Sequence, residues 1–426
     1  MSAFGRVSSS RSRSARTALS AVTIAVAGAL VLAGCSGGGG SGGTTASGDL
    51  DLKIGTILPQ TGSLAVLGPP EIAGVGLAEK DINDAKAGIQ VTVTDKDSGD
   101  TTTDIASQSA TSLIADGNSA IIGAASSGVS KTFIDQVTQA GVVQLSPANT
   151  SPDFSTYKDD GYFWRTAPSD VLQGRILGNK ILKDGKTNVS ILYMNDAYGT
   201  GLEANIKKTL EDNGATIAAE QVFEPSATDF NSAITSVLAP NPDALVVISF
   251  DEVKTIADQL ASKGFDFNKF YGTDGNYGII TEADTNVDIA GAQFTNPGVE
   301  AKEDFQSRLQ DMVKAEGDPA LTVFSYSAES YDGTVLLALA ALQGKSTDGA
   351  TLKANLKSVS EGGTKCESFA DCAKLIKEGT DIDYDGLSGP ITFDDNGDPT
   401  EAYVSVYKYG QGNTRTFSEQ VYGKLN

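Results

Sequence analysis

The chain has 426 residues, of which 40% are apolar and 20% are charged, a composition typical of a globular protein with a sizeable core. Asp and Glu outnumber Lys and Arg by 54 to 32, and the net charge of −22 argues against general binding to nucleic acids or anionic membranes. The sequence contains no histidine, which excludes Ser-His-Asp and Cys-His nucleophilic sites, His-ligated zinc and histidine general bases.

The first 34 residues have the pattern of an export signal. Four arginines precede an apolar run over 18–32, which is short for a membrane span. The run ends in Leu-Ala-Gly-Cys35, which resembles the lipobox of bacterial lipoproteins, where the chain is cleaved before the cysteine and the cysteine is acylated. We predict a signal peptide over 1–34 and a lipid on Cys35; a plain signal peptide and an uncleaved anchor are the alternatives.

A Gly/Ser linker follows the lipid site over 35–48. Its sequence after Cys35, SGGGGSGGTTASG, has no side chain that can build a core, so it is expected to behave as a flexible coil. Lipid and linker together would hold a globular body at the outer face of the cell membrane.

From residue 49 onward, predicted strands and helices alternate. Alternation of this kind indicates an α/β fold with mostly parallel sheets covered by helices. Strands are predicted at 52–58, 89–94, 120–122, 142–145, 189–194, 217–223, 244–250 and 402–409, and helices at 71–83, 103–116, 129–140, 169–183, 200–213, 229–238, 252–263, 299–315 and 328–343.

One sheet holding all these strands would be unusually large, so we divide the chain into two doubly wound, Rossmann-like lobes. Crossings between the lobes are predicted at 165–170, 293–298 and 394–399, which together form a three-segment hinge. The expected N-terminal lobe comprises 49–167 plus 297–398, and the expected C-terminal lobe comprises 168–296 plus 399–426.

Two cysteines lie close together near the end of the chain. An exported location is oxidising, so Cys366 and Cys372 are predicted to form a disulfide, with two free thiols as the alternative. Two cysteines without histidine partners fall short of a zinc site.

The run 381–386 begins like a calcium loop, but Thr392 stands at its last ligand position, so no metal is predicted.

Five loop motifs follow strands in a characteristic order. They are KIGTILPQTG (53–62), GAASSG (123–128), LSPANTSP (145–152), NDAYGTG (195–201) and YGTDGN (271–276). In this order the chain resembles the extracytoplasmic solute-binding proteins of ABC importers. Within that group it resembles the leucine/isoleucine/valine-binding family, which has the type I periplasmic-binding fold.

The resemblance implies a non-enzymatic, cofactor-free and monomeric receptor. It would capture a branched-chain or similar amino acid between its lobes and deliver it to ABC permease subunits, with no nucleic-acid partner. Two other hypotheses stay open at this stage. One is a sensory receptor of the same fold for amides, urea or small acids, and the other is an enzyme that uses carboxylates.

The carboxylate of the ligand is expected at two strand ends. Ser126 and Ser127 stand at a strand-to-helix junction, where free backbone N–H groups favour an anion, although either serine could simply cap the helix. Ala148, Asn149 and Thr150 repeat the arrangement one strand along, where a Ser-Pro turn is the alternative.

The ammonium group of the ligand needs a carboxylate once it is buried. Asp274 is the candidate, because it lies between two glycines after a predicted strand; a solvated Asp-Gly turn is the alternative. The family more often has glutamate at this position. Asp251 either caps the helix that follows it or faces the cleft. The aromatic candidates for the ligand pocket are Tyr198, Phe250, Tyr277 and Tyr326.

Overall fold

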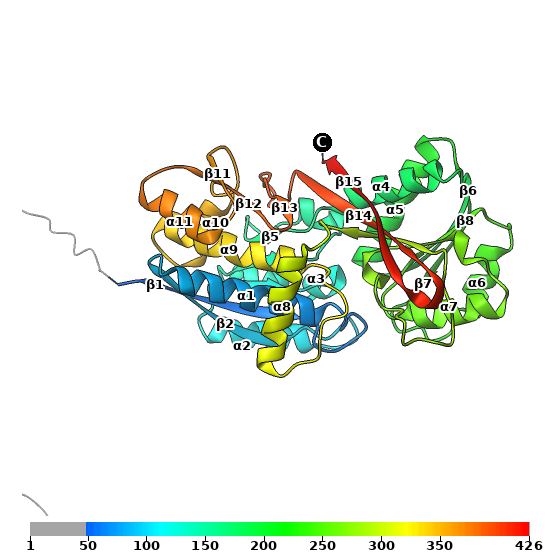
Figure 1. The fold of residues 1–426 in the computed structure, drawn as a ribbon, viewed down its shortest axis with the longest axis horizontal. Coiled ribbons are helices and arrows are strands. Elements are labelled where there is room, and N and C mark those ends of the chain that lie inside the picture. Colours follow the sequence, from blue (N-terminus) through cyan, green and yellow to red (C-terminus); the bar gives the residue numbers. More distant parts are fainter. Residues whose placement is uncertain (1–47, 426) are drawn as a thin grey trace, which may run out of the picture. The chain divides into compact units, whose positions relative to one another are not determined.

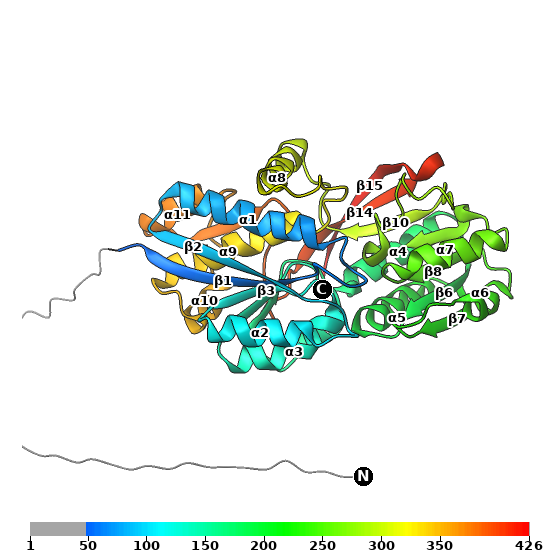
Figure 2. The ribbon, with the colours of Figure 1, turned by 90° about the horizontal axis from the view of Figure 1, so that it is seen from below.

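The structure is a computed structural model that describes residues 48–425. Within this range two α/β lobes are each built on one large sheet (Figures 1 and 2). The predicted signal peptide, the lipid site at Cys35 and nearly all of the linker lie outside the described residues.

The first sheet has five parallel strands in the order β2-β1-β3-β4-β5. Its inner strands β3 and β4 are buried at every residue, because helices cover both faces of the sheet. Figure 2 shows α1 and α9 on one face and α2 and α3 on the other. The strands are β1 (Leu50–Leu58), β2 (Ile89–Asp97), β3 (Ala120–Gly123), β4 (Val143–Ser146) and β5 (Phe163–Arg165), and the helices are α1 (Gly68–Ala85), α2 (Ile105–Ala115), α3 (Ser127–Gln139), α8 (Glu303–Glu316), α9 (Ser327–Gly344), α10 (Gly349–Leu356) and α11 (Phe369–Lys377).

The second sheet has seven strands in the order β15-β14-β10-β9-β8-β6-β7. The strands from β10 to β7 are parallel, while β14 and β15 run antiparallel to their neighbours. Its strands are β6 (Asn188–Met194), β7 (Thr216–Phe223), β8 (Ala244–Ile248), β9 (Phe270–Gly272), β10 (Gln293–Pro297), β14 (Glu401–Tyr409) and β15 (Arg415–Lys424), and its helices are α4 (Asp170–Lys183), α5 (Ala197–Asp212), α6 (Asn231–Leu238) and α7 (Glu252–Ser262).

Smaller elements complete the fold. A three-stranded sheet lies beside α9 and α11, with strands β11 (Thr364–Cys366), β12 (Ile382–Gly386) and β13 (Gly389–Pro390). Short 3₁₀ helices are η1 (Pro152–Thr156), η2 (Phe267–Lys269), η3 (Asp274–Asn276) and η4 (Gln411–Asn413). None of the helices within 48–425 is long and apolar enough to cross a membrane.

The predicted fold class is confirmed, as is the disulfide between Cys366 and Cys372, which joins β11 to α11. Elements that the sequence did not predict include α10, α11 and the antiparallel strand β15. The exact lobe boundaries given above stay predictions.

A buried ion pair connects two of the predicted crossings. Arg165 is fully buried at the end of β5, and its guanidinium donates to both carboxylate oxygens of Asp398, at 2.6 and 2.8 Å. Its remaining N–H groups donate to the carbonyls of Asn149 and Ser151 and to the hydroxyl of Ser155. All five guanidinium donors are therefore used, which fixes the first crossing against the third.

Candidate functional site

The carboxyl ends of both sheets meet at a small cavity between the lobes. Ligands of open α/β sheets bind beyond these strand ends. The cavity spans ≈ 240 Å³, a volume that includes open solvent at its mouth, and it is lined by seven of the residues that the sequence proposed for ligand binding. Its lining consists of Leu64, Leu67, Ala125, Ser126, Ser127, Ala148, Tyr198, Phe250, Asp274, Gly275 and Tyr326.

The first-lobe wall begins with a turn that only glycine permits. Gly123 has φ +127°, and a Cβ there would lie 2.1 Å from the carbonyl oxygen of Ile57. This turn places Ser126 at the N-cap of α3, where its hydroxyl accepts a hydrogen bond from the N–H of Val129 at 3.3 Å. Ser126 therefore both caps the helix and lines the cavity. The first N–H groups of a helix have no intrahelical partner, so this wall favours an anion.

The next strand end supports that wall from behind. The hydroxyl of Ser146 accepts from the N–H groups of Ala148 and Asn149. The side-chain amide of Asn149 donates to the carbonyls of Ala124 and Ala125, at 2.9 and 2.8 Å. Asn149 thus ties the two loops together and does not line the cavity, while Ala148 does. Thr150 is buried behind this wall.

Asp274 supplies a buried carboxylate on the second-lobe wall. Its Oδ1 accepts from Gln173 Nε2 at 2.8 Å and lies 2.8 Å from the hydroxyl of Tyr198, while its Oδ2 accepts from the hydroxyl of Tyr326 at 2.7 Å. Burial raises the pKa of Asp274, and these hydrogen bonds oppose the rise. None of the three partners is a cation, so the carboxylate is held in place without being neutralised.

Aromatic rings form the floor beside Asp274. The rings of Tyr198 and Phe250 are stacked, with centroids 5.5 Å apart and an interplanar angle of 13°. Gly275 leaves room for both rings because glycine has no Cβ. A Cβ at this residue would lie only 2.9 Å from an atom of each ring, which is too close. Tyr198 is thus packed beneath its helix and also exposed to the cavity.

Tyr326 joins the two lobes across the site. It precedes α9, which packs against the first sheet, and it has φ +61°. Its hydroxyl reaches Asp274 of the second lobe.

A second contact across the site runs from the N–H of Asp251 to the carbonyl of Ser63. The side chain of Asp251 neither caps α7 nor lines the cavity, and burial raises its pKa.

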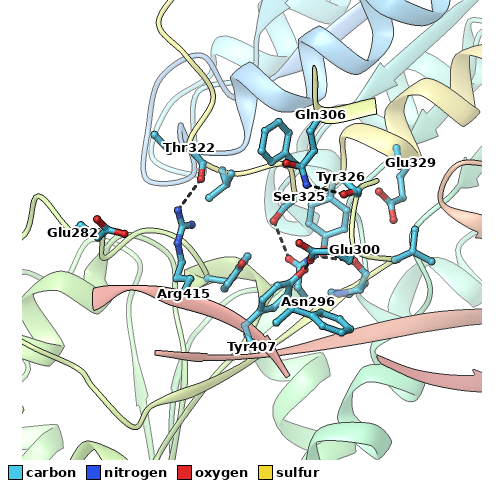
Figure 3. A pocket seen from close by; sticks show the side chains of 18 residues that line it. Glu282, Asn296, Glu300, Gln306, Thr322, Ser325, Tyr326, Glu329, Tyr407 and Arg415 are labelled. Atoms are coloured by element: carbon cyan, nitrogen blue, oxygen red, sulfur yellow. Dashed lines mark hydrogen bonds between the residues drawn. The ribbon is translucent and has the colours of Figure 1, made fainter. Parts of the chain in front are cut away.

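Tyr277 is not brought to this cavity. It lies in a larger cavity of ≈ 890 Å³ of empty space, shown in Figure 3, where its ring stacks on Tyr407 with centroids 4.3 Å apart. The guanidinium of Arg415 lies 5.7 Å from the same ring and donates to the carbonyl of Thr322. A ligand-binding role for Tyr277 therefore has no support from its position.

Sequence reasoning missed several residues of the site. Leu64 and Leu67 line the cavity from the loop after the first motif, and Gln173 holds Asp274 from α4. No local pattern marked Gln173, because its contact with Asp274 spans 101 residues of sequence.

The cavity is tightly closed. It has room for about one water molecule. An amino acid therefore enters only if walls from the two lobes move apart, which breaks the contact between Tyr326 and Asp274. Hinge motions of this kind are common in two-lobed binding proteins.

Among residues 48–425, no cluster of acidic or cysteine side chains is arranged to hold a metal ion.

Comparison with known proteins places this geometry in a family. The periplasmic binding protein family matches residues 51–413. The chain belongs to this family. It is 26% identical over 380 residues to the Leu/Ile/Val-binding protein BraC3 of Rhizobium johnstonii, a match that covers 85% of this chain and 92% of that protein.

Solved structures share the fold with different ligands bound. The branched-chain amino acid transporter substrate-binding protein LivJ of Streptococcus pneumoniae, in complex with isoleucine, aligns with a TM-score of 0.69 at 24% identity over 88% of this chain and 99% of that one. A solute-binding protein of an R. palustris ABC transporter, in complex with 4-hydroxybenzoate, aligns with a TM-score of 0.70 at 16% identity over 88% and 97%. The shared fold therefore leaves the ligand to be argued from the site.

Proposed function

We propose that this protein is the extracytoplasmic substrate-binding component of an ABC importer, and that it captures a small aliphatic α-amino acid between its lobes. The observation that carries the proposal is the buried carboxylate of Asp274, which faces the cavity opposite the N-terminus of α3. These two features are complementary to the ammonium and carboxylate groups of an amino acid.

The charges and the apolar lining together narrow the ligand class. An aromatic acid such as 4-hydroxybenzoate has no ammonium group, so it would bring a second negative charge close to Asp274. An amino acid would instead neutralise this carboxylate. Leu64, Leu67 and Phe250 supply apolar surface for an uncharged side chain. Binding without catalysis and delivery to permease subunits follow from the same proposal.

A ligand series tests the proposal by removing one charged group at a time. We expect L-leucine, L-isoleucine or L-valine to bind in calorimetric titrations. Leucine without its amino group (4-methylpentanoate) and without its carboxylate (3-methylbutylamine) should each bind at least ~10-fold more weakly, because a hydrogen bond to a charged group contributes about 1.5–3 kcal/mol. Tight binding of 4-hydroxybenzoate together with no binding of any amino acid would refute the proposal.

We further propose that the protein is a lipoprotein held at the outer face of the cell membrane through Cys35. Replacing Cys35 with alanine should release the protein into the medium or leave an uncleaved precursor, because acylation and cleavage both need the cysteine. Fractionation of cells that express each form measures the result. Normal processing and unchanged membrane retention of Cys35→Ala would rule out the lipid anchor.

A further inference from the structure

The larger cavity, around Tyr407 and Arg415, is not used by the proposed function. It spans ≈ 890 Å³, a volume that includes open solvent at its mouth. Residues of both lobes line it, among them Glu329 in the first turn of α9 and Arg415 at the start of β15. Tyr326 lines both this cavity and the smaller one at Asp274, so the two adjoin.

A buried carboxylate without a partner points to a ligand in this cavity. Glu329 is only 4% exposed, and its carboxylate points into the cavity (Figure 3). No other residue among 48–425 donates a hydrogen bond to it. Gly298 makes room for this carboxylate, since it has φ +94° and a Cβ there would lie 2.1 Å from Glu329 Oε1. Because a buried polar group without a partner is costly, a ligand that donates hydrogen bonds is favoured here.

The charges around the cavity favour a cation. Glu282 and Glu300 are exposed residues of its lining, and Arg415 is the one cation among the described residues that line it. The guanidinium of Arg415 donates to the carbonyl of Thr322 rather than to any of these acids. Three acids therefore face one cation, and the two exposed acids would attract a positively charged ligand.

A second buried acid adds negative charge near Glu329. Glu71, in the first turn of α1, is fully buried, and neither of its carboxylate oxygens has a hydrogen-bond partner among the described residues. The helices α1 and α9 pack so closely that a Cβ at Gly74 would lie 2.3 Å from the carbonyl oxygen of Ser327. Burial raises the pKa of both carboxyl groups, that of Glu329 to about 8, and no described cation opposes the rise.

We propose that this cavity binds a small aliphatic amine, whose ammonium group donates hydrogen bonds to the carboxylate of Glu329. The site is separate from the amino-acid cavity, so this proposal does not rest on the proposed function. An ammonium group supplies N–H donors and a positive charge, which are the two properties that the surroundings of Glu329 lack. Phe324 and Phe417 supply apolar surface for the carbon chain. A metal ion is disfavoured, because the acids within 48–425 are not grouped as metal ligands.

Calorimetric titration of the full chain with 1,4-diaminobutane tests this proposal. At about pH 8.5 the amine is protonated, because an alkylamine has a pKa near the ~10.4 of lysine, while much of Glu329 is ionised. The parent should bind saturably, and Glu329→Gln, which keeps the shape of the side chain, should bind at least ~10-fold more weakly. No saturable binding by the parent, or equal binding by Glu329→Gln, would overturn the proposal.

Two further variants control for general charge effects and for folding. Glu303 is an exposed acid in the first turn of α8 and does not line the cavity, so Glu303→Gln should bind the diamine like the parent. An equal loss in Glu303→Gln and Glu329→Gln would overturn the proposal. Glu300→Gln alters an exposed acid of the lining and should weaken binding. If circular dichroism shows that Glu329→Gln is unfolded, unchanged affinity in Glu300→Gln would overturn the proposal.

Comparison compounds and one more variant test the chemistry and the place of binding. 1,4-Butanediol has the same chain without charge, and tetramethylammonium has the charge without N–H donors, so each should bind at least ~10-fold more weakly. Equal binding of either compound would overturn the proposal. Asp274→Ala should bind the diamine like the parent, and loss of that binding would place the amine in the amino-acid cavity and overturn the proposal. Failure of every amino acid to bind, with diamine binding intact, would count against the proposed function alone.

Discussion

Replacing Asp274 with alanine should weaken amino-acid binding at least ~10-fold, since 1.4 kcal/mol corresponds to a factor of ten and a hydrogen bond to a charged group contributes about 1.5–3 kcal/mol. The variant removes the buried carboxylate that accepts from Gln173, Tyr198 and Tyr326. The ammonium of the ligand would then be buried without a counter-charge. Calorimetric titration with the amino acid that binds the parent most tightly measures the loss.

Two further variants separate charge from shape. Asp274→Asn keeps the size of the side chain but removes its charge, so it should lose nearly as much affinity as Asp274→Ala. Thr150→Val removes one neutral hydroxyl and should lose less. Circular dichroism checks that each variant is folded. Binding by Asp274→Asn as tight as that of the parent would contradict the ammonium assignment.

The largest effect on stability is expected at the buried ion pair between the crossings. Asp398→Ala removes the partner of a fully buried guanidinium, and breaking a buried pair in this way costs about 3–5 kcal/mol. Denaturant unfolding of the parent and the variant measures this free energy, and the midpoint should fall clearly.

The same turn provides a matched control for this prediction. Asp395 pairs with Lys357 but its side chain is 91% exposed, so Asp395→Ala should leave the unfolding midpoint close to that of the parent. Similar losses in Asp395→Ala and Asp398→Ala would mean that the ion pair of Arg165 has no special role. That pair joins two of the predicted crossings.

Elements with a strong local signal were predicted well. The sequence Pro-Pro-Glu71 and the apolar residues that follow it at helical spacing predicted the helix observed as α1. The continuous apolar run that begins at Ala244 predicted β8, which is buried at every residue. By contrast, β15 is an edge strand with largely exposed side chains, so its sequence lacks the apolar signal of an inner strand.

The site was predicted in outline because strand ends of a parallel sheet meet at one edge. Ser126 and Asp274 were expected at such strand ends, and both line the cavity. Gln173 contacts Asp274 across 101 residues of sequence, and no local pattern encodes such a contact. Tyr277 lies only three residues after Asp274, yet it lines the other cavity because the backbone leaves η3 in an extended conformation.

The most direct test of the central claim is a crystal structure of the complex with the amino acid that binds most tightly. We predict that the ligand ammonium lies within hydrogen-bond distance of the carboxylate of Asp274, and that the ligand carboxylate lies at Ser126 and Ser127, where α3 begins. An amino acid bound in the opposite orientation, or in the cavity around Tyr277 and Arg415, would contradict this account.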